Sequence, residues 1–210
     1  MKIYKLVFIA FLTTTNLCFG QSVIERQIEI FASTAVSGTE FQIEIKIDHD
    51  STKLKFRIRD SISIKLDNDS NYNAIRNYLL SLKTLDINND TVLVHLNTLK
   101  SIAEKYTFYS ADSITIQNLA NGDYLNLINE VFLSTTDSLE NKILNKNRIT
   151  LDGTSLAFSF IDKDSKRKIY ARSPSKESHP LLYKLVTSST SLYRLVKKND
   201  FLNRRVFLRY

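Results

Sequence analysis

The three histidines of the chain are His49, His95 and His179, and their spacing matches no metal site. A zinc pair on a helix uses His-x-x-x-His or a similar interval, which places both rings on one face. Here each histidine stands alone: His49 in a turn, His95 beside an apolar helical stripe and His179 at the start of a helical segment. Lone polar residues of this kind usually serve the structure. We therefore expect no metal ion, no cofactor and no histidine base.

Two short acidic segments hold oxygen ligands close together. Residues 67–71 match the first ligand positions of a calcium-binding EF-hand loop. The match then fails, because Tyr72 stands where that loop requires glycine and Tyr78 stands where it requires glutamate. Residues 48–50 offer two aspartates and a histidine, fewer ligands than the roughly six to eight oxygens that calcium takes. We interpret both segments as turns, and the first also as a helix cap.

Glycine is too scarce for the common catalytic loops. The 210 residues contain 4 glycines, and none forms the Gly-x-Ser-x-Gly turn of a serine nucleophile, a phosphate loop or a dinucleotide fingerprint. Paired carboxylates of a glycoside hydrolase come from distant positions, so a hydrolase with dispersed Asp and Glu residues remains an alternative. The sequence singles out no catalytic residue, and we lean towards a protein that is not an enzyme.

Charge is distributed unevenly along the chain. Residues 21–162 contain 14 Lys and Arg against 19 Asp and Glu, whereas residues 163–210 contain 13 against 3. A surplus of cations on one side of a protein concentrates anionic partners there. We predict an anion-binding or partner-binding site composed of Arg172, Lys197, Lys198, Arg204, Arg205 and Arg209. The alternative is that the basic segment neutralises the acidic part within the fold.

The loop 172–180 is the most distinctive candidate within the basic segment. It joins a basic strand to a basic helix and reads Arg-Ser-Pro-Ser-Lys-Glu-Ser-His-Pro. The free N–H groups at a helix N-terminus favour negative charge, which predicts an anion-binding loop. Proline and serine are also common in loops that connect a strand to a helix, so a purely connecting loop is the second interpretation.

The first twenty residues have the layout of a secretory signal peptide. Lys2 and Lys5 precede an apolar run over 6–12, and Cys18 and Gly20 place small residues before a cleavage point at Gly20-Gln21. A membrane anchor needs about 20 apolar residues, more than this run supplies. We expect a periplasmic or extracellular protein whose mature chain lacks cysteine. Lipidation of Cys18 is the alternative, although that motif prefers a small residue at Leu17.

Alternating residues predict strands, and helical spacing predicts the elements between them. Residues 41–47 and 54–58 alternate apolar with polar residues around a turn at 48–52. The simplest register pairs Ile45 with Phe56 and Glu44 with Arg57. Further strands are expected at 27–31, 114–116, 149–151, 156–160 and 168–172. Helices are expected at 70–82, 90–106, 124–132, 138–146 and 178–196, with Asp90, Asp137 and Ser178 as caps.

These elements predict an α+β fold, with antiparallel sheets built from hairpins and several amphipathic helices packed on one face. We expect residues 21–210 to form one domain, with 146–148 as the place of any subdivision. No segment of the mature chain is long and apolar enough to span a membrane.

The function that these observations favour is an exported, non-enzymatic binding module with a basic C-terminal region. Its expected partner is an anionic envelope polymer or a protein. Nucleic acid is not expected, because no nucleic-acid-binding motif is present. Besides the hydrolase, an envelope assembly subunit that offers an exposed sheet edge is an alternative.

Overall fold

The computed structural model describes residues 26–34, 38–82, 89–146, 154–163 and 165–203. The described chain forms a six-stranded antiparallel sheet in the order β4-β3-β2-β1-β5-β6, with helices around it, so the predicted α+β class is confirmed. The strands are β1 (Arg26–Thr34), β2 (Gly38–Ile47), β3 (Ser51–Ile62), β4 (Thr107–Gln117), β5 (Ser155–Asp162) and β6 (Ser165–Arg172). The helices are α2 (Ser70–Ser81), α3 (Asp90–Lys105), α4 (Gly122–Leu133), α5 (Thr136–Glu140), α6 (Lys142–Asn145) and α7 (Pro180–Val196), with 3₁₀ turns η1 (Ile64–Asn68) and η2 (Leu119–Asn121). The expected signal peptide at 1–20 and the expected strand at 149–151 lie outside the described residues.

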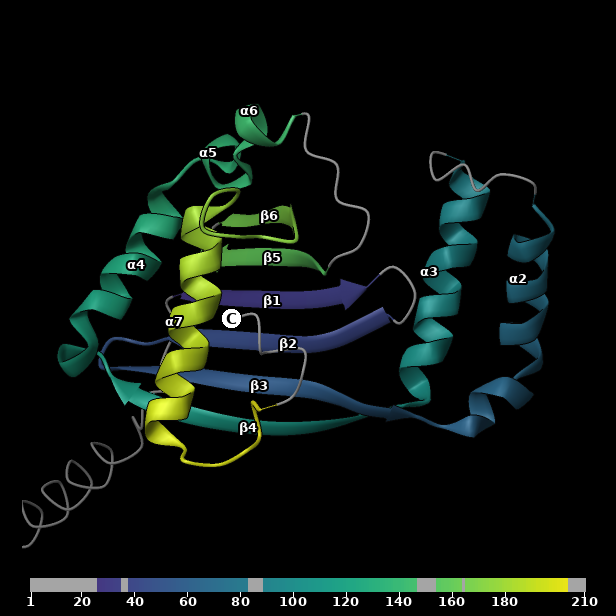
Figure 1. Cartoon of the computed structure of the whole chain (residues 1–210), viewed down its shortest axis with the longest axis horizontal. Coiled ribbons are helices and arrows are strands. Elements are labelled where there is room, and N and C mark those ends of the chain that lie inside the picture. The colour runs from purple at the N-terminus through teal and green to yellow at the C-terminus, as the bar shows by residue number, and fades with distance from the viewer. Residues whose placement is uncertain (1–25, 35–37, 83–88, 147–153, 164, 204–210) are drawn as a thin grey trace, which may run out of the picture.

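One face of the sheet is apolar and the other is polar, because the strands alternate between the two kinds of residue. The apolar side chains of β1, β2, β3 and β5 are buried under α4 and α7, which cross this face together (Figure 1). Tyr193 of α7 is fully buried and meets Phe56 edge to face, with ring centroids 4.9 Å apart. Further along α7, Leu192 is partly buried and Val196 is exposed, whereas Ser189 and Thr190 are buried.

The hairpin β2–β3 is confirmed, but its predicted register is wrong by two residues. Ile45 faces Leu54, and Glu44 faces Lys55. The turn is tighter than expected, because the N–H of Asp48 donates to the carbonyl oxygen of Ser51 at 2.9 Å and only two residues remain in the loop. A shift of two keeps each side chain on its predicted face, so the core is unaffected.

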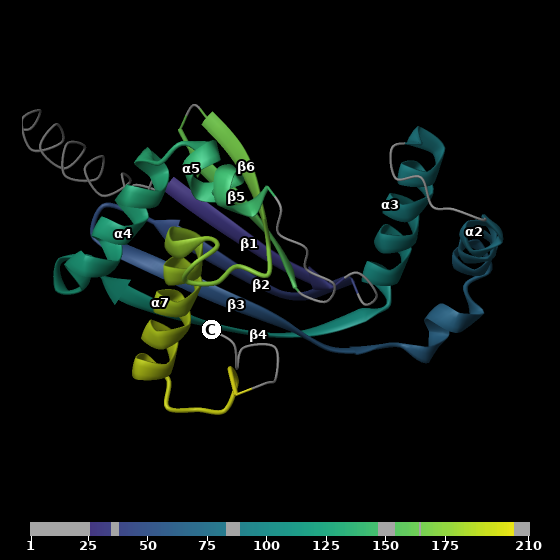
Figure 2. The ribbon, with the colours of Figure 1, turned by 45° about the horizontal axis from the view of Figure 1, so that its top comes forward.

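The pair α2–α3 lies beyond the end of β3 and β4, away from the helices that cover the sheet (Figure 2). Asp69 links the start of α2 to the end of α3. Its carboxylate accepts a hydrogen bond from the N–H of Tyr72 at 2.9 Å and another from the hydroxyl of Tyr106 at 2.8 Å. The helix cap predicted within residues 67–71 is therefore confirmed and is Asp69, whereas α3 is capped by Asn89 rather than Asp90.

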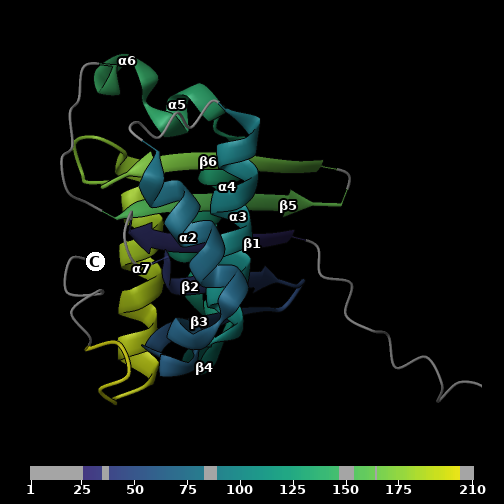
Figure 3. The same ribbon diagram turned by 90° about the vertical axis from the view of Figure 1, so that its right-hand side faces the viewer.

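Several predicted boundaries are corrected. β4 spans eleven residues, because β3 continues to Ile62 through a bulge near Asp60 and supplies a longer partner. Asn121-Gly122 forms the start of α4, not an isolated turn. The predicted helix 138–146 is divided at Asn141, and Thr135 rather than Asp137 caps its first part. Strand β5 pairs with β1 and β6 along its length, so both of its edges are occupied (Figure 3).

Arg167 of β6 holds the C-terminal end of α4. Its guanidinium donates to the carbonyl oxygens of Val131 at 2.9 Å, Phe132 at 3.2 Å and Ser134. The last carbonyls of a helix have no partner within the helix, so this cation satisfies groups that would otherwise need water. It also lies 5.2 Å from the ring centroid of Phe160. The contact fixes the chain that leads from α4 into α5 against the edge strand of the sheet.

Replacing Arg167 with lysine should destabilise the fold. A lysine keeps the charge but cannot reach three carbonyls at once, and hydrogen bonds made by a charged group contribute about 1.5–3 kcal/mol. We expect the free energy of unfolding in urea to fall by about 2 kcal/mol. The control is Lys168→Ala at the neighbouring exposed position, which should change it by less than about 0.5 kcal/mol. Equal effects of the two substitutions would show that Arg167 does not hold α4.

Candidate functional site

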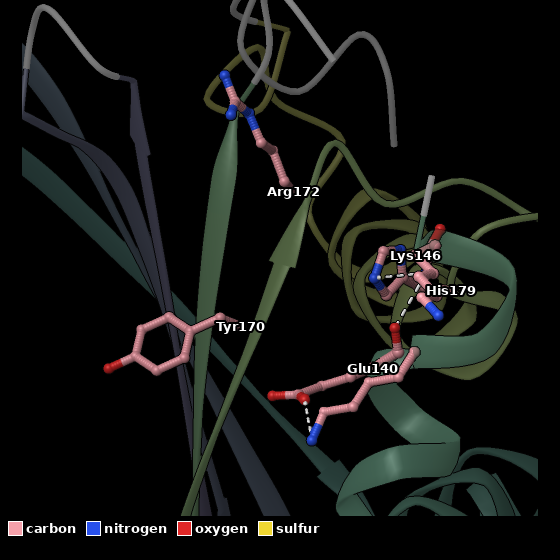
Figure 4. Close-up of a pocket in the computed structure, with 7 residues that line it drawn as sticks. Glu140, Lys146, Tyr170, Arg172 and His179 are labelled. Atoms are coloured by element: carbon pink, nitrogen blue, oxygen red, sulfur yellow. Dashed lines mark hydrogen bonds and ion pairs between the residues drawn. The ribbon is translucent and has the colours of Figure 1, made fainter. Parts of the chain in front are cut away.

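A hollow of about 430 Å³ lies between α6 and the end of β6 (Figure 4). Three cationic side chains line it, two from α6 and its C-cap and one from β6: Lys142, Lys146 and Arg172. Glu140, Asn145, Tyr170 and His179 complete the lining. The hollow thus joins residues that are separated by about thirty positions in the chain and contains one carboxylate among its cations.

Asparagine residues fix the helical wall of the hollow. Asn141 has φ 48°, a left-handed conformation that asparagine tolerates better than most residues, and it ends α5 there. The side-chain amides of Asn141 and Asn145 both donate to the carbonyl oxygen of Ser178, each at 3.0 Å. These bonds tie α5 and α6 to the loop that precedes α7.

His179 is part of the same framework. Its side chain is buried, with Nδ1 3.0 Å from the hydroxyl of Ser178 and Nε2 3.3 Å from the amide nitrogen of Asn145. Both ring nitrogens thus lie within hydrogen-bond distance of polar groups in the framework. Ser178, which we predicted to cap α7, instead exchanges backbone-to-hydroxyl bonds with Ser175, and His179 occupies the capping position. The ring therefore positions the wall of the hollow.

The edge of β6 forms the opposite wall. Figure 4 shows Glu140, Lys146 and His179 on one side of this strand, while the side chains of Tyr170 and Arg172 extend away from them. Tyr170 is 65 % exposed. The hollow consequently runs beside the backbone of the strand rather than beneath its side chains.

The charge of the hollow is positive but partly balanced. The ammonium of Lys142 lies 2.7 Å from Asp137 and 3.4 Å from Glu140, and the bond to Asp137 is the main reason that the pKa of Lys142 is raised. On the polar face of β6, Lys166 and Lys168 are exposed and extend the positive charge along the strand.

The structure separates the cations that we predicted as one site. Arg172 lines the hollow, whereas Lys197 and Lys198 follow the other end of α7, about 25 Å along that 17-residue helix. Lys197 lies beside β4, at the opposite edge of the sheet from β6. Arg204, Arg205 and Arg209 lie outside the described residues. Lys142 and Lys146 were missed, although their spacing of four residues places both on one side of a helix.

A second hollow, of about 930 Å³, lies between α4 and α7. Its charged lining consists of Asp123, Glu130 and Lys184. The two carboxylates are seven residues apart on one helix, which separates their backbones by about 10 Å. This backbone spacing does not fix the distance between the two carboxyl groups, which is roughly 5–9.5 Å in glycosidases. This hollow gives the hydrolase alternative no specific support.

No family model, curated protein or solved structure matches the chain. Within the described ranges, no three His, Cys, Asp or Glu side chains form a group that could hold a metal ion. None of the helices in that same part of the chain has the length and apolarity to cross a bilayer. The geometry of the hollows is therefore the basis for any functional proposal.

Asp112 of β4 accounts for the position of Lys197. Its carboxylate accepts a hydrogen bond from the hydroxyl of Tyr193 at 2.6 Å and another from the ammonium of Lys197 at 3.2 Å. The bond from Tyr193 is the largest cause that lowers the pKa of Asp112 to about 2, and burial followed by the same bond raises the pKa of Tyr193 to about 12. Lys197 thus neutralises an acidic residue within the fold.

This cluster predicts an acid-sensitive contribution to stability. The pKa of Asp112 is lowered in the folded state, so its stabilising effect is present above the unfolded value of about 3.9 and is lost as the pH falls towards 2. Urea unfolding should show that wild type exceeds Asp112→Asn in stability at neutral pH and that this difference shrinks between about pH 4 and pH 2. Tyr193→Phe, which removes the main cause, should reduce the same pH dependence. A difference that is constant with pH would contradict the assignment.

Proposed function

We propose that this chain is an exported, non-enzymatic binding protein that holds an anionic partner at the hollow beside β6. The observation that carries the proposal is that Lys142, Lys146 and Arg172, from two distant segments, line one hollow. The polar groups behind them, including His179, are engaged in holding the wall. This arrangement suits binding better than proton transfer, since the buried ring already uses both nitrogens.

The expected strength of binding follows from the exposure of these cations. An exposed ion pair contributes about 0.2–1 kcal/mol, so a single contact is weak and several must act together. Attraction between exposed charges is also screened over about 8–10 Å at physiological salt. We therefore expect an interaction that is readily weakened by salt and that depends on more than one of the cations.

Charge reversal at the hollow should weaken retention on an anionic matrix. We expect Lys146→Glu/Arg172→Glu to elute from dextran sulfate at clearly lower salt than the wild type, because two attractive contacts become repulsive. The control, Lys53→Glu/Lys100→Glu, makes the same change of net charge at exposed positions on β3 and α3. The readout is the salt concentration at elution, after equal melting temperatures confirm folding.

Equal shifts for the two variants would mean that net charge alone governs retention, which would contradict a site at the hollow. A larger loss for Arg204→Glu/Arg205→Glu/Arg209→Glu than for the hollow variant would instead place the binding surface in the C-terminal residues.

Export predicts a defined N-terminus. If the first twenty residues are a signal peptide, the protein recovered from its native source begins at Gln21, without Cys18. Mass spectrometry of the intact protein measures this directly. Recovery of a chain that retains Met1 and Cys18 would contradict export, and a lipid adduct on Cys18 would establish membrane anchoring instead.

A further inference from the structure

We infer that the edge of β6, where it borders the hollow, binds an extended acidic segment of a partner protein, which joins the sheet as an additional antiparallel or parallel strand. This inference rests on the proposed function and names its partner class. It requires that backbone groups on β6 point away from the sheet, that the edge has room for a strand, and that the surrounding charge selects the occupant.

The direction of the backbone groups follows from the hydrogen bond that ends the β5–β6 ladder. The N–H of Ser173 donates to the carbonyl oxygen of Thr154 at 2.9 Å, in the register that also pairs Arg172 with Ser155. Hydrogen-bonded pairs alternate along an antiparallel ladder. Residues 171, 169 and 167 therefore bond to β5, while residues 170, 168 and 166 direct their N–H and C=O groups away from it.

Those outward groups are unpaired within the described residues. Within the described part of the chain, no backbone or side-chain partner reaches the main-chain N–H or C=O of Lys166, Lys168 or Tyr170. All three residues are exposed. A row of such groups at an edge is the template that an added strand uses, since main-chain bonds supply much of the affinity.

The opposite edge of the sheet differs from β6, because one of its outward backbone groups is already engaged by a charged side chain. On β4 the bond from the N–H of Asn118 to the carbonyl oxygen of Asp50 sets the alternation, so the N–H of Ser113 points outward. That N–H donates to the carboxylate of Asp112 at 2.7 Å, and Lys197 covers the same carboxylate. An inward-facing charge of this kind is a common protection for an edge strand.

The hollow provides space along the second half of the β6 edge. Neighbouring strands lie about 4.8 Å apart, so a docked strand needs a channel beside the backbone. The hollow of about 430 Å³ lies beside Tyr170 and Arg172, with Glu140, Lys146 and His179 as its far wall (Figure 4). An added segment would thus contact β6 with its backbone and the wall with its side chains.

Charge favours an acidic partner over a second copy of this chain. Lys166 and Lys168 project on the polar face of β6, and Lys146 lies across the hollow, so carboxylates on an added strand find opposite charges beside them. Two copies of β6 paired antiparallel would bring these lysines towards each other or towards Arg172. Like charges directly opposite in a sheet are destabilising.

A proline variant and an alanine variant of Tyr170 separate backbone pairing from side-chain contact. Proline at an outward position of an edge strand removes the outward N–H and leaves the ladder to the inner strand intact. The probe is a labelled eight-residue peptide that alternates Glu and Val, the length of β6. By fluorescence anisotropy at low salt, we expect Tyr170→Pro to weaken binding by about tenfold or more and the matched Tyr170→Ala by less than about threefold.

A second probe does not depend on the folding of any variant. The same peptide, methylated on alternate backbone nitrogens, keeps its charge but cannot donate to β6. Only the nitrogens that face β6 matter, so two peptides are tested, each methylated on one of the two alternating sets. We expect wild-type protein to bind one of them at least about tenfold more weakly than the unmodified peptide. A Lys-Val peptide should not bind.

The outcomes distinguish this inference from the proposed function. Strand addition is overturned if both methylated peptides bind as tightly as the unmodified one, or if Tyr170→Pro and Tyr170→Ala bind the peptide equally. If Lys146→Glu/Arg172→Glu also binds the peptide more weakly, the anion site remains supported. Binding of dextran sulfate without binding of the peptide also overturns strand addition and identifies a polymer partner.

Weaker peptide binding by Tyr170→Pro, with no effect of charge reversal, supports strand addition and overturns the anion site. Self-association that Tyr170→Pro abolishes would overturn the acidic partner in favour of a second copy.

Discussion

The guanidinium of Arg167 is the interaction on which the arrangement of the site depends. It lies on the edge strand and binds the last carbonyls of α4, so the end of that helix cannot move independently of the sheet. Glu140 and Lys146, which belong to the far wall of the hollow, follow soon after in the chain. Burial lowers the pKa of Arg167, but arginine remains charged in proteins, so the contact persists across the physiological range. One basic residue of the C-terminal segment thus serves the fold rather than the proposed binding.

The two edge strands of the sheet, β4 and β6, differ in their outward backbone groups and in the charges beside them. This difference bears on which kind of strand could pair with each edge. At β4, Asp112 satisfies an outward N–H and is held by Tyr193 and Lys197. At β6 the backbone groups remain outward, and the exposed lysines beside them oppose a second basic strand. Open pairing groups alone would invite aggregation, whereas the cations that flank these groups disfavour pairing with another basic strand. The fold therefore combines an attractive element with a repulsive one at the same edge.

Alternation of apolar and polar residues predicted the strands well, because it reports which face is buried. It did not predict the register of β2 and β3, which a two-residue turn decides. Counting charge along the chain located Arg172 but grouped it with Lys197, because a linear count does not show that α7 separates them. Lys142 and Lys146 were missed for the related reason that they belong to a segment with a net negative charge. Only the folded chain brings them to the end of β6.

The loop before α7 lies at the predicted place, but the predicted physical basis differs from what the structure offers. The sequence argument relied on free N–H groups at a helix terminus. In the structure Ser175 and Ser178 bind each other's backbone N–H groups, and Pro180, the first residue of α7, has none. The loop contributes by fixing the wall through the carbonyl of Ser178, and the positive charge comes from side chains on neighbouring elements. Because side-chain charges are more exposed than a helix terminus, recognition at this site should be governed by salt and by the spacing of carboxylates on the partner.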